Sequence, residues 1–211
     1  MTLTGRGRAV DGDAHVSVAM PAERAYVPVM PPTPALMTAD ELLHLSVPDK
    51  CTELVRGMLV VREPPGSLHG LVAMTLGVEL GVFARNTGAG RVFAAETGFK
   101  LASNPDTVRA ADVAFVSSER MEGARTVGYA ALAPDLVVEV LSPNDRPGEA
   151  LAKVADWLSA GTKLVWIVDP ERRLARVYRH DGTEVLLNAD DALDGEDVLP
   201  GFSCLVATIL A

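Results

Sequence analysis

Cysteine is scarce in this sequence, and the two cysteines present form no recognisable motif. Cys51 and Cys204 are the only two among 211 residues, and neither belongs to a C-x-x-C pair. Disulfide-stapled domains and structural zinc sites need several closely spaced cysteines, so both classes are excluded. We expect free, buried thiols in a reducing compartment.

Positive charge is also scarce, since the formal net charge is −9. Proteins that coat nucleic acid without sequence preference need clustered Lys and Arg, so that class is excluded as well. One segment gathers Arg172, Arg173, Arg176 and Arg179 and is a candidate for a local basic groove. A charged strand edge that resists aggregation is the simpler interpretation, and we favour it.

Long apolar runs and several common catalytic motifs are missing too. The first residues lack the apolar centre of a signal peptide, and no apolar run approaches about 18 residues. We therefore expect neither secretion nor membrane insertion, and predict a cytoplasmic protein. The motifs G-x-S-x-G, G-x-x-x-x-G-K, H-E-x-x-H and G-x-G-x-x-G are all absent, which narrows the enzyme classes to consider.

A proline-rich start precedes the patterned part of the chain. Residues 1–36 contain five prolines and no sustained periodicity, so we predict an extended or disordered leader there. A single ordered domain should then occupy residues 37–211, because its length and 48% hydrophobic content suit one core. Thr38 and Glu41 match a capping box, which predicts a short helix ending before Pro48.

The rest of the chain alternates between strand and helix patterns. Residues 52–61 predict two short strands joined at Arg56-Gly57, and Ser67 is the expected cap of a long helix ending near Asn86. Further strands are predicted over residues 91–101, 108–116, 163–170, 174–180 and 183–188, the last two forming a hairpin. The acidic run 190–197 is expected to be a solvated loop. This order predicts an α/β fold with a mixed sheet.

Residues 135–161 read as a buried strand, a Ser-Pro turn and a helix closed by glycine. Strand alternation places Glu139 among apolar neighbours on a strand that is covered on both faces. An ionised carboxylate without a partner in such a place costs roughly several kcal/mol. A metal ion, a cation or a proton must therefore accompany Glu139.

Asp112 and Lys153 are the groups expected to join Glu139. Asp112 is flanked by Ala110 and Ala114 on its own face of an apolar strand, and Lys153 lies at the margin of the apolar face of the next helix. Two carboxylates on adjacent strands can share a divalent cation, and Mg²⁺ prefers oxygen ligands. With an ammonium group beside them, they predict phosphodiester hydrolysis, in which charge develops on phosphate oxygens and a water molecule loses a proton.

These residues resemble a known family. The matching blocks are residues 109–113 (RAADV), residues 135–143 (DLVVEVLSP), Lys153, Gly161 and residues 166–170 (WIVDP), and they look like the Uma-type endonucleases, domain of unknown function 820. That family belongs to the PD-(D/E)XK, or restriction-endonuclease-like, superfamily. The resemblance runs from about Thr38 to the C-terminus and implies a restriction-endonuclease-like mixed central sheet flanked by helices.

The resemblance also implies a site and a substrate. Asp112 and Glu139 would be ligands of Mg²⁺ or Mn²⁺, with the Val140 carbonyl as a third ligand. Lys153 would orient the attacking water or stabilise the phosphate, and Glu53 in the TELVRG block matches the family's N-terminal acid. The implied substrate is DNA, and the implied assembly is a homodimer.

Two positions depart from the superfamily pattern. The lysine normally follows the acid by two places, but that place is Leu141 here, so Lys153 must supply the cation. Ala111 stands where a proline usually precedes the first acid, and that residue shapes the backbone without binding anything. His69 matches a histidine at the start of the family's long helix, and we do not count it as catalytic because such residues are more often satisfied boundary residues.

Each residue also has a purely structural interpretation. Glu139 would be an ordinary salt-bridge partner, Asp112 would meet Arg109 at a turn, and Lys153 would pair with Glu149 on the helix surface. The N-terminal acid would be a solvated residue of an edge strand. Two other functions also remain open: a catalytically silent nuclease-fold module for binding or assembly, and a hydrolase of non-nucleic phosphoesters.

Overall fold

The computed structural model describes Thr2, residues 35–143 and residues 145–210. The predicted leader, residues 1–36, lies almost wholly outside the described residues. The first helix is α1 (Ala39–His44), and its capping box is confirmed. The Thr38 Oγ1 atom accepts a hydrogen bond from the Glu41 N–H at 3.2 Å, and a Glu41 carboxylate oxygen accepts one from the Thr38 N–H at 2.7 Å.

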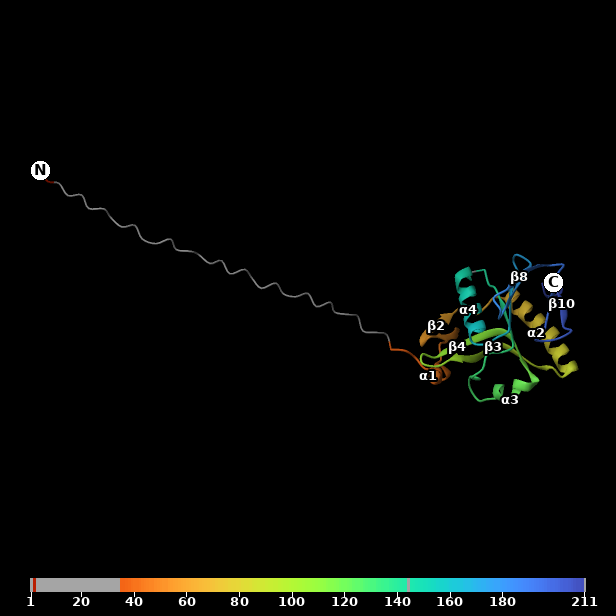
Figure 1. Cartoon of the computed structure of the whole chain (residues 1–211), viewed down its shortest axis with the longest axis horizontal. Helices are drawn as coiled ribbons and strands as arrows, with labels where there is room; N and C mark the ends of the chain where they lie inside the picture. Colours follow the sequence, from red (N-terminus) through yellow and green to blue (C-terminus); the bar gives the residue numbers. More distant parts are fainter. Residues whose placement is uncertain (1, 3–34, 144, 211) are drawn as a thin grey trace. The chain divides into compact units, whose positions relative to one another are not determined.

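An eight-stranded mixed sheet lies at the centre of the described residues (Figure 1). Its strands are β1 (Cys51–Val55), β2 (Met58–Arg62), β3 (Gly90–Ala102), β4 (Thr107–Ser117), β5 (Leu136–Val140), β6 (Leu164–Asp169), β7 (Leu174–Arg179) and β8 (Glu184–Asn188). The order is β2-β1-β4-β5-β6-β7-β8, with β3 also paired to β4. Only the β5–β6 pair is parallel among these pairings. The predicted mixed sheet is therefore confirmed.

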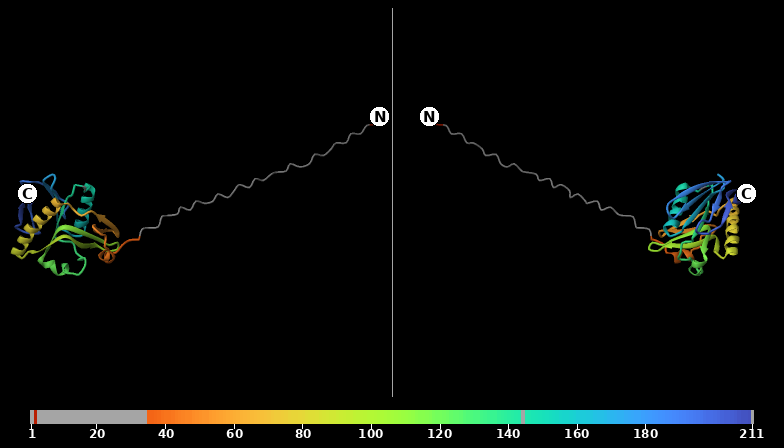
Figure 2. Two further views of the ribbon diagram at one scale, coloured as in Figure 1. Left: turned by 180° about the vertical axis from the view of Figure 1, so that it is seen from behind. Right: turned by 45° about the vertical axis from the view of Figure 1, so that its right-hand side comes forward.

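Two long helices cover opposite faces of this sheet (Figure 2). The helix α2 (Ser67–Thr87) packs Val72, Leu76 and Leu80 against one face, and α4 (Pro147–Ser159) packs Val154 and Trp157 against the other. The remaining elements are η1 (Ser118–Arg120), α3 (Met121–Ala124), a small sheet of β9 (Ala192–Asp194) and β10 (Ser203–Leu205), and α5 (Val206–Ile209).

The strand β4 has different neighbours along its two edges. One edge pairs with β3 along nearly its whole length. The other edge meets β1 at Val108 and then β5 at residues 113–115. Between these two contacts lies a short stretch of β4 where β1 and β5 diverge. Side chains from three strands can therefore converge at this fork.

Three predictions about local structure were wrong. Gly66, not Ser67, is the N-cap residue of α2, and no side chain caps that helix end. The acidic run is not only a loop, because β9 lies within it and pairs with β10 while Leu193 is fully buried. Both cysteines are free, as expected, but Cys51 is only partly buried.

Within the described residues, α2 is the one helix whose length and apolar composition would suit a membrane crossing, with a mean hydropathy of 1.5. The sequence predicted this helix but no long apolar run, because glycines and Glu79 interrupt its apolar residues. Its inward side chains pack on the sheet, and helices packed on a core through one face commonly meet the same criterion. Length and composition alone therefore do not make it a membrane helix.

Candidate active site

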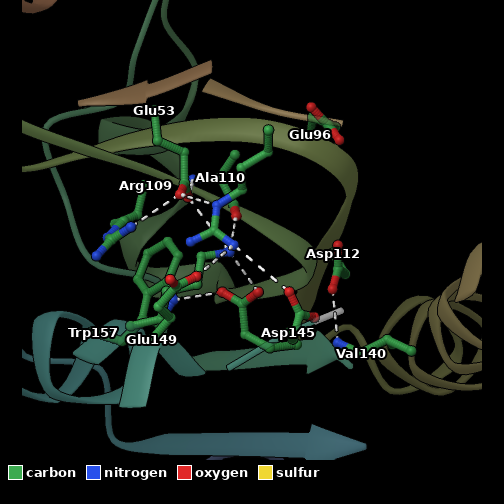
Figure 3. Close-up of polar contacts among 12 residues, drawn as sticks. Glu53, Glu96, Arg109, Ala110, Asp112, Val140, Asp145, Glu149 and Trp157 are labelled. Carbon is green, nitrogen blue, oxygen red and sulfur yellow. Dashed lines mark hydrogen bonds and ion pairs between the residues drawn. The ribbon is translucent and has the colours of Figure 1, made fainter. Parts of the chain in front are cut away.

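A cavity of about 490 Å³ opens at the fork between β1, β4 and β5. All five residues predicted for the site line it: Glu53, Asp112, Glu139, Val140 and Lys153. They come from β1, β4, β5 and α4. Figure 3 shows polar contacts around this cavity, with Glu53, Asp112 and Val140 labelled. The fold thus brings together residues that lie far apart in the sequence.

Glu139 is a buried carboxylate with two hydrogen-bond donors. It is 5% exposed, and its Oε2 atom lies 2.7 Å from the Lys153 ammonium, while Trp157 donates its indole N–H to Oε1 at 2.8 Å. Burial raises the pKa of Glu139 to about 7, with the negative charges of Asp112 and Glu53 adding to the effect and Lys153 opposing it. Negative charge at this position is therefore only partly compensated.

For Lys153 the sequence left two positions open, one in the site and one on the surface of its helix. Its Nζ atom lies 2.7 Å from Glu139, 3.4 Å from Glu53 and 3.3 Å from the carbonyl oxygen of Ala110. Burial alone would lower the pKa of Lys153, but the surrounding carboxylates raise it above its ordinary value. The alternative surface pair with Glu149 is wrong, since Lys153 points into the cavity.

Glu53 is ionised and tightly held. Arg109 donates to its Oε2 atom at 2.9 Å, and the Ala110 N–H donates to Oε1 at 3.0 Å. Burial works against the charged form, but Lys153 and Arg109 lower the pKa of Glu53 below its usual value. Arg109 is in turn fixed by Asp156, with nitrogen–oxygen distances of 2.9 and 2.6 Å. The interpretation of Glu53 as an edge-strand residue was wrong. Glu53 belongs to β1, which lies between β4 and the edge strand β2.

Asp112 lies where the regular alternation of β4 is interrupted. Ala111 and Ala114 pack on the α4 side of the sheet, whereas Val113 packs on the α2 side, so Asp112 does not share a regular face with Ala114 as predicted. A bulge in β3 accompanies this break, since two residues, Ala95 and Glu96, stand opposite Asp112 alone.

The Asp112 carboxylate has two close partners. Its Oδ2 atom accepts the Val140 N–H at 2.7 Å and lies 3.2 Å from His69 Nε2. Burial would lower the pKa of His69, but the hydrogen bond and charge of Asp112 raise it. Arg109 pairs with Glu53 and Asp156 instead, so the alternative Asp112–Arg109 pair was wrong. The structure therefore brings His69 into the site.

The donor set was tested for a divalent cation. No three His, Cys, Asp or Glu side chains lie together as a metal cage in the part of the chain that the structure describes. Mg²⁺ is usually held by only one or two carboxylates, with water and substrate phosphates completing its shell. Asp112 and Glu139 fit that requirement, and the raised pKa of Glu139 shows that a nearby positive charge would be favourable. Glu53 fits less well, because its charge is already balanced by Arg109 at 2.9 Å and Lys153 at 3.4 Å.

Sequence reasoning missed several residues of this site. Trp157 was placed on the apolar face of its helix, but its donor atom was not assigned to Glu139. Arg62 reaches in from the edge strand β2 and lies 3.6 Å from Glu53. A buried arginine inside a strand needs carboxylate partners, so the position of Arg109 in a predicted apolar strand could have indicated that it belongs to the site. No feature of the sequence indicated the same for Arg62.

Comparison with known proteins bears on both the family and the fold. Residues 39–208 match the family model Uma2, described as "Putative restriction endonuclease". The fold resembles a crystal structure described as a putative nuclease belonging to DUF820 from Anabaena variabilis ATCC 29413, with a TM-score of 0.71 and 19% sequence identity. That match covers 82% of this chain and 97% of the other, and at this identity it concerns the fold alone. No curated protein matches the sequence.

Proposed function

The chain belongs to the Uma2 family, whose description is "Putative restriction endonuclease", and from this premise we propose that it is a metal-dependent endonuclease that hydrolyses phosphodiester bonds in DNA. The observation that carries the proposal is the buried cluster in which Lys153 lies between Glu139 and Glu53, with Asp112 at the same cavity. Two further expectations are a cytoplasmic location, from the sequence composition, and a homodimeric assembly, from the family resemblance.

Asp112 and Glu139 would hold Mg²⁺ or Mn²⁺, with the Val140 carbonyl as a third ligand. When bound, the ion lowers the pKa of a water molecule and neutralises charge on phosphate oxygens. Trp157 fixes the orientation of the Glu139 carboxylate through its indole N–H. The buried walls of the cavity keep these groups in place before substrate arrives, which is the arrangement that electrostatic catalysis requires.

Lys153 supplies fixed positive charge and does not act as the base. Its ammonium faces three acceptors, Glu139, Glu53 and the Ala110 carbonyl, and its pKa is raised, so it stays protonated. A charged ammonium in this position can donate to a phosphate oxygen or orient the attacking water. Glu53 holds Lys153 from the other side and is itself held by Arg109. Glu53 is therefore assigned as a positioning residue.

Nicking of supercoiled plasmid in Mg²⁺ or Mn²⁺ tests the proposal. We expect the wild-type protein to nick the plasmid, Glu139→Gln and Lys153→Met to lose at least a hundredfold of that activity, and a chelator to abolish it. Glu149→Gln is the matched control, because Glu149 lines the same cavity but its side chain is 50% exposed. Equal nicking by all four proteins would reveal a contaminant. No nicking by any of them would favour the silent binding module.

A further inference from the structure

A second cavity, of about 550 Å³, adjoins the candidate active site. Both cavities share part of their lining, namely Leu141, Ser142, Pro143, Asp145, Ala150 and Ile167. Ile167 is the cross-strand neighbour of Glu139 in β5 and of Arg176 in β7, so all three lie on the same face of the sheet. A chain-like ligand can therefore extend from one cavity into the other without leaving this face.

The second cavity differs from the first in its arginines. Arg146, Arg172 and Arg176 line it and do not line the first cavity, and their side chains are 84%, 74% and 43% exposed. Lys153, by contrast, is 14% exposed, and Arg62, which also lines the first cavity, is 31% exposed. The second cavity thus adds the most exposed arginines beside the site.

The arginine-rich segment that the sequence singled out divides into two pairs. Arg179 is held by the Glu196 carboxylate at 2.8 and 2.9 Å, and Arg173 donates to the Leu210 carbonyl, so these two serve the fold. Arg172 and Arg176 face the second cavity. The interpretation of this segment as a charged strand edge therefore does not account for Arg172 and Arg176.

Neighbouring carboxylates orient these guanidinium groups without using all their donors. Asp169 lies 3.1 Å from an Arg172 nitrogen, and Glu184 lies 3.8 Å from an Arg176 nitrogen. A guanidinium has five N–H donors in a planar fork, so several remain for a phosphate. Glu171 adds a further acidic group to the lining, which keeps the attraction for polyanions in general low.

The spacing of the strands suits phosphates of one strand of nucleic acid that lie a short way apart. Arg176 lies two strands away from Glu139 across the sheet, roughly 10 Å, since adjacent strands are about 4.8 Å apart. Its guanidinium lies toward Glu184 of β8, on the side away from β5. A phosphate held by Arg172 and Arg176 would therefore lie somewhat farther than this from a phosphate placed at Glu139 and Lys153.

We propose that this second cavity binds a phosphate of the same nucleic-acid strand, a short way along it from the one that is hydrolysed, through Arg172 and Arg176, with Arg146 at its rim. The inference rests on the proposed function and adds to it the path of the substrate strand. It assigns binding, and no chemical step, to these arginines.

Fluorescence anisotropy with labelled oligonucleotides tests the proposal, with Ca²⁺ replacing Mg²⁺ and a gel confirming that the DNA stays intact. The double variant Arg172→Gln/Arg176→Gln is compared with Arg85→Gln/Arg125→Gln, which removes equal charge from residues that line neither cavity. We expect the cavity variant to bind about tenfold more weakly and to lower the salt slope by roughly 1, because one phosphate contact contributes about 0.7 to 0.9. The control pair should match the wild type.

Several outcomes would overturn the proposal: equal weakening by both pairs, unchanged binding by the cavity variant, or no binding by the wild type. Thermal melting shows whether the exposed arginines can be replaced without unfolding, and Arg146→Gln provides an independent, milder variant. If the wild type does not cut DNA but the cavity variant binds DNA more weakly than the wild type, the inference is supported and only the nuclease reaction is refuted. Cleavage with an unchanged KM in the cavity variant would refute only the inference.

Discussion

Glu139 and Lys153 share one buried space, and their charges depend on each other. Lys153 stays protonated because three acceptors surround it, whereas Glu139 has a pKa raised to about 7 by burial and by Asp112 and Glu53. Arg109 is the close counter-charge of Glu53, and Lys153 offsets the charge of Glu139 only in part. A divalent cation would neutralise the remaining negative charge of Glu139 and Asp112, and a group of this kind is typical of functional sites.

Replacing Lys153 with methionine should be far more harmful than replacing another lysine. The change removes the cation from beside Glu139 and Glu53, so we expect nicking activity to fall at least a hundredfold. Unfolding in urea should show a loss of about 1 to 3 kcal/mol, because two buried carboxylates lose a partner. Lys163→Met is the control, since that side chain is 56% exposed. Equal activity of the two variants would contradict the role of Lys153.

Asp156→Asn should act through Arg109 and not on the reacting atoms. Asp156 holds Arg109, which in turn holds Glu53, so the variant loosens the support of Lys153. We expect kcat to fall about tenfold while KM and the affinity for Mn²⁺ stay unchanged. Steady-state kinetics and a metal titration check both parts. A weaker Mn²⁺ affinity with an unchanged kcat would show that Asp156 has a different role.

The site residues were predictable to different degrees. Glu139 and Asp112 stood out because a carboxylate on an apolar strand needs a partner. Helical spacing left Lys153 between the site and a surface pair with Glu149, and the family resemblance favoured the site. What the sequence could not provide was the break in alternation at Asp112, which depends on a bulge in β3 opposite it. Nor could it place Arg62 or the indole of Trp157, because both contacts join elements whose packing is set by the whole sheet.

At the scale of elements, the strands and the two long helices were predictable from periodicity. The hairpin of β1 and β2 followed from Arg56-Gly57, whose positive φ values of 50° and 76° suit a tight two-residue turn. The order of strands was not predictable from periodicity, since the fork along β4 depends on which strands pair. Leu193 shows the same limit, because its burial in a short strand within an acidic run depends on β10 and the core.

The junction between β4 and β5 is stabilised by Asp135, which is buried but lies outside the site. Its carboxylate accepts the Ser117 N–H at 2.9 Å and an Arg120 N–H at 2.9 Å, and Lys163 lies 3.4 Å away. Burial works against the charged form, but these partners lower the pKa of Asp135 below its ordinary value. Its contribution to stability is therefore present above the ordinary pKa of an aspartate and is lost as the pH falls through the lowered value.

We expect Asp135→Asn to reduce the free energy of unfolding by about 1 to 3 kcal/mol at neutral pH. The wild type should lose this advantage on acidification below about pH 4, where the carboxylate of the folded protein takes up a proton. Thermal melting from pH 7 to pH 3 measures both effects. Parallel melting curves for the two proteins over the whole range would contradict this assignment.

At the scale of the molecule, the net charge of −9 opposes the proposed binding of DNA, because like charges repel. The conflict is resolved if binding depends on a metal ion at the acidic cavity and on the arginines beside it. Affinity for DNA should then be low without a divalent cation. The family membership and the fold are compatible with this dependence.

Oligonucleotide binding should therefore increase at least tenfold when Mn²⁺ is added to the wild-type protein, since the ion neutralises carboxylates that repel phosphate. Asp112→Asn should show little increase. Anisotropy titrations at constant ionic strength measure the difference, with Mn²⁺ replaced by a matched concentration of a monovalent salt as the control. An equal increase in the variant would mean that the ion acts elsewhere.

Calorimetric titration with Mn²⁺ tests most directly the central claim that Asp112 and Glu139 form a divalent-cation site beside Lys153. The wild type and the control Glu149→Gln should each bind Mn²⁺ at a saturable site. Asp112→Asn and Glu139→Gln should bind it at least tenfold more weakly, since each loses a carboxylate ligand. Binding by Asp112→Asn as tight as that of the wild type would contradict the account.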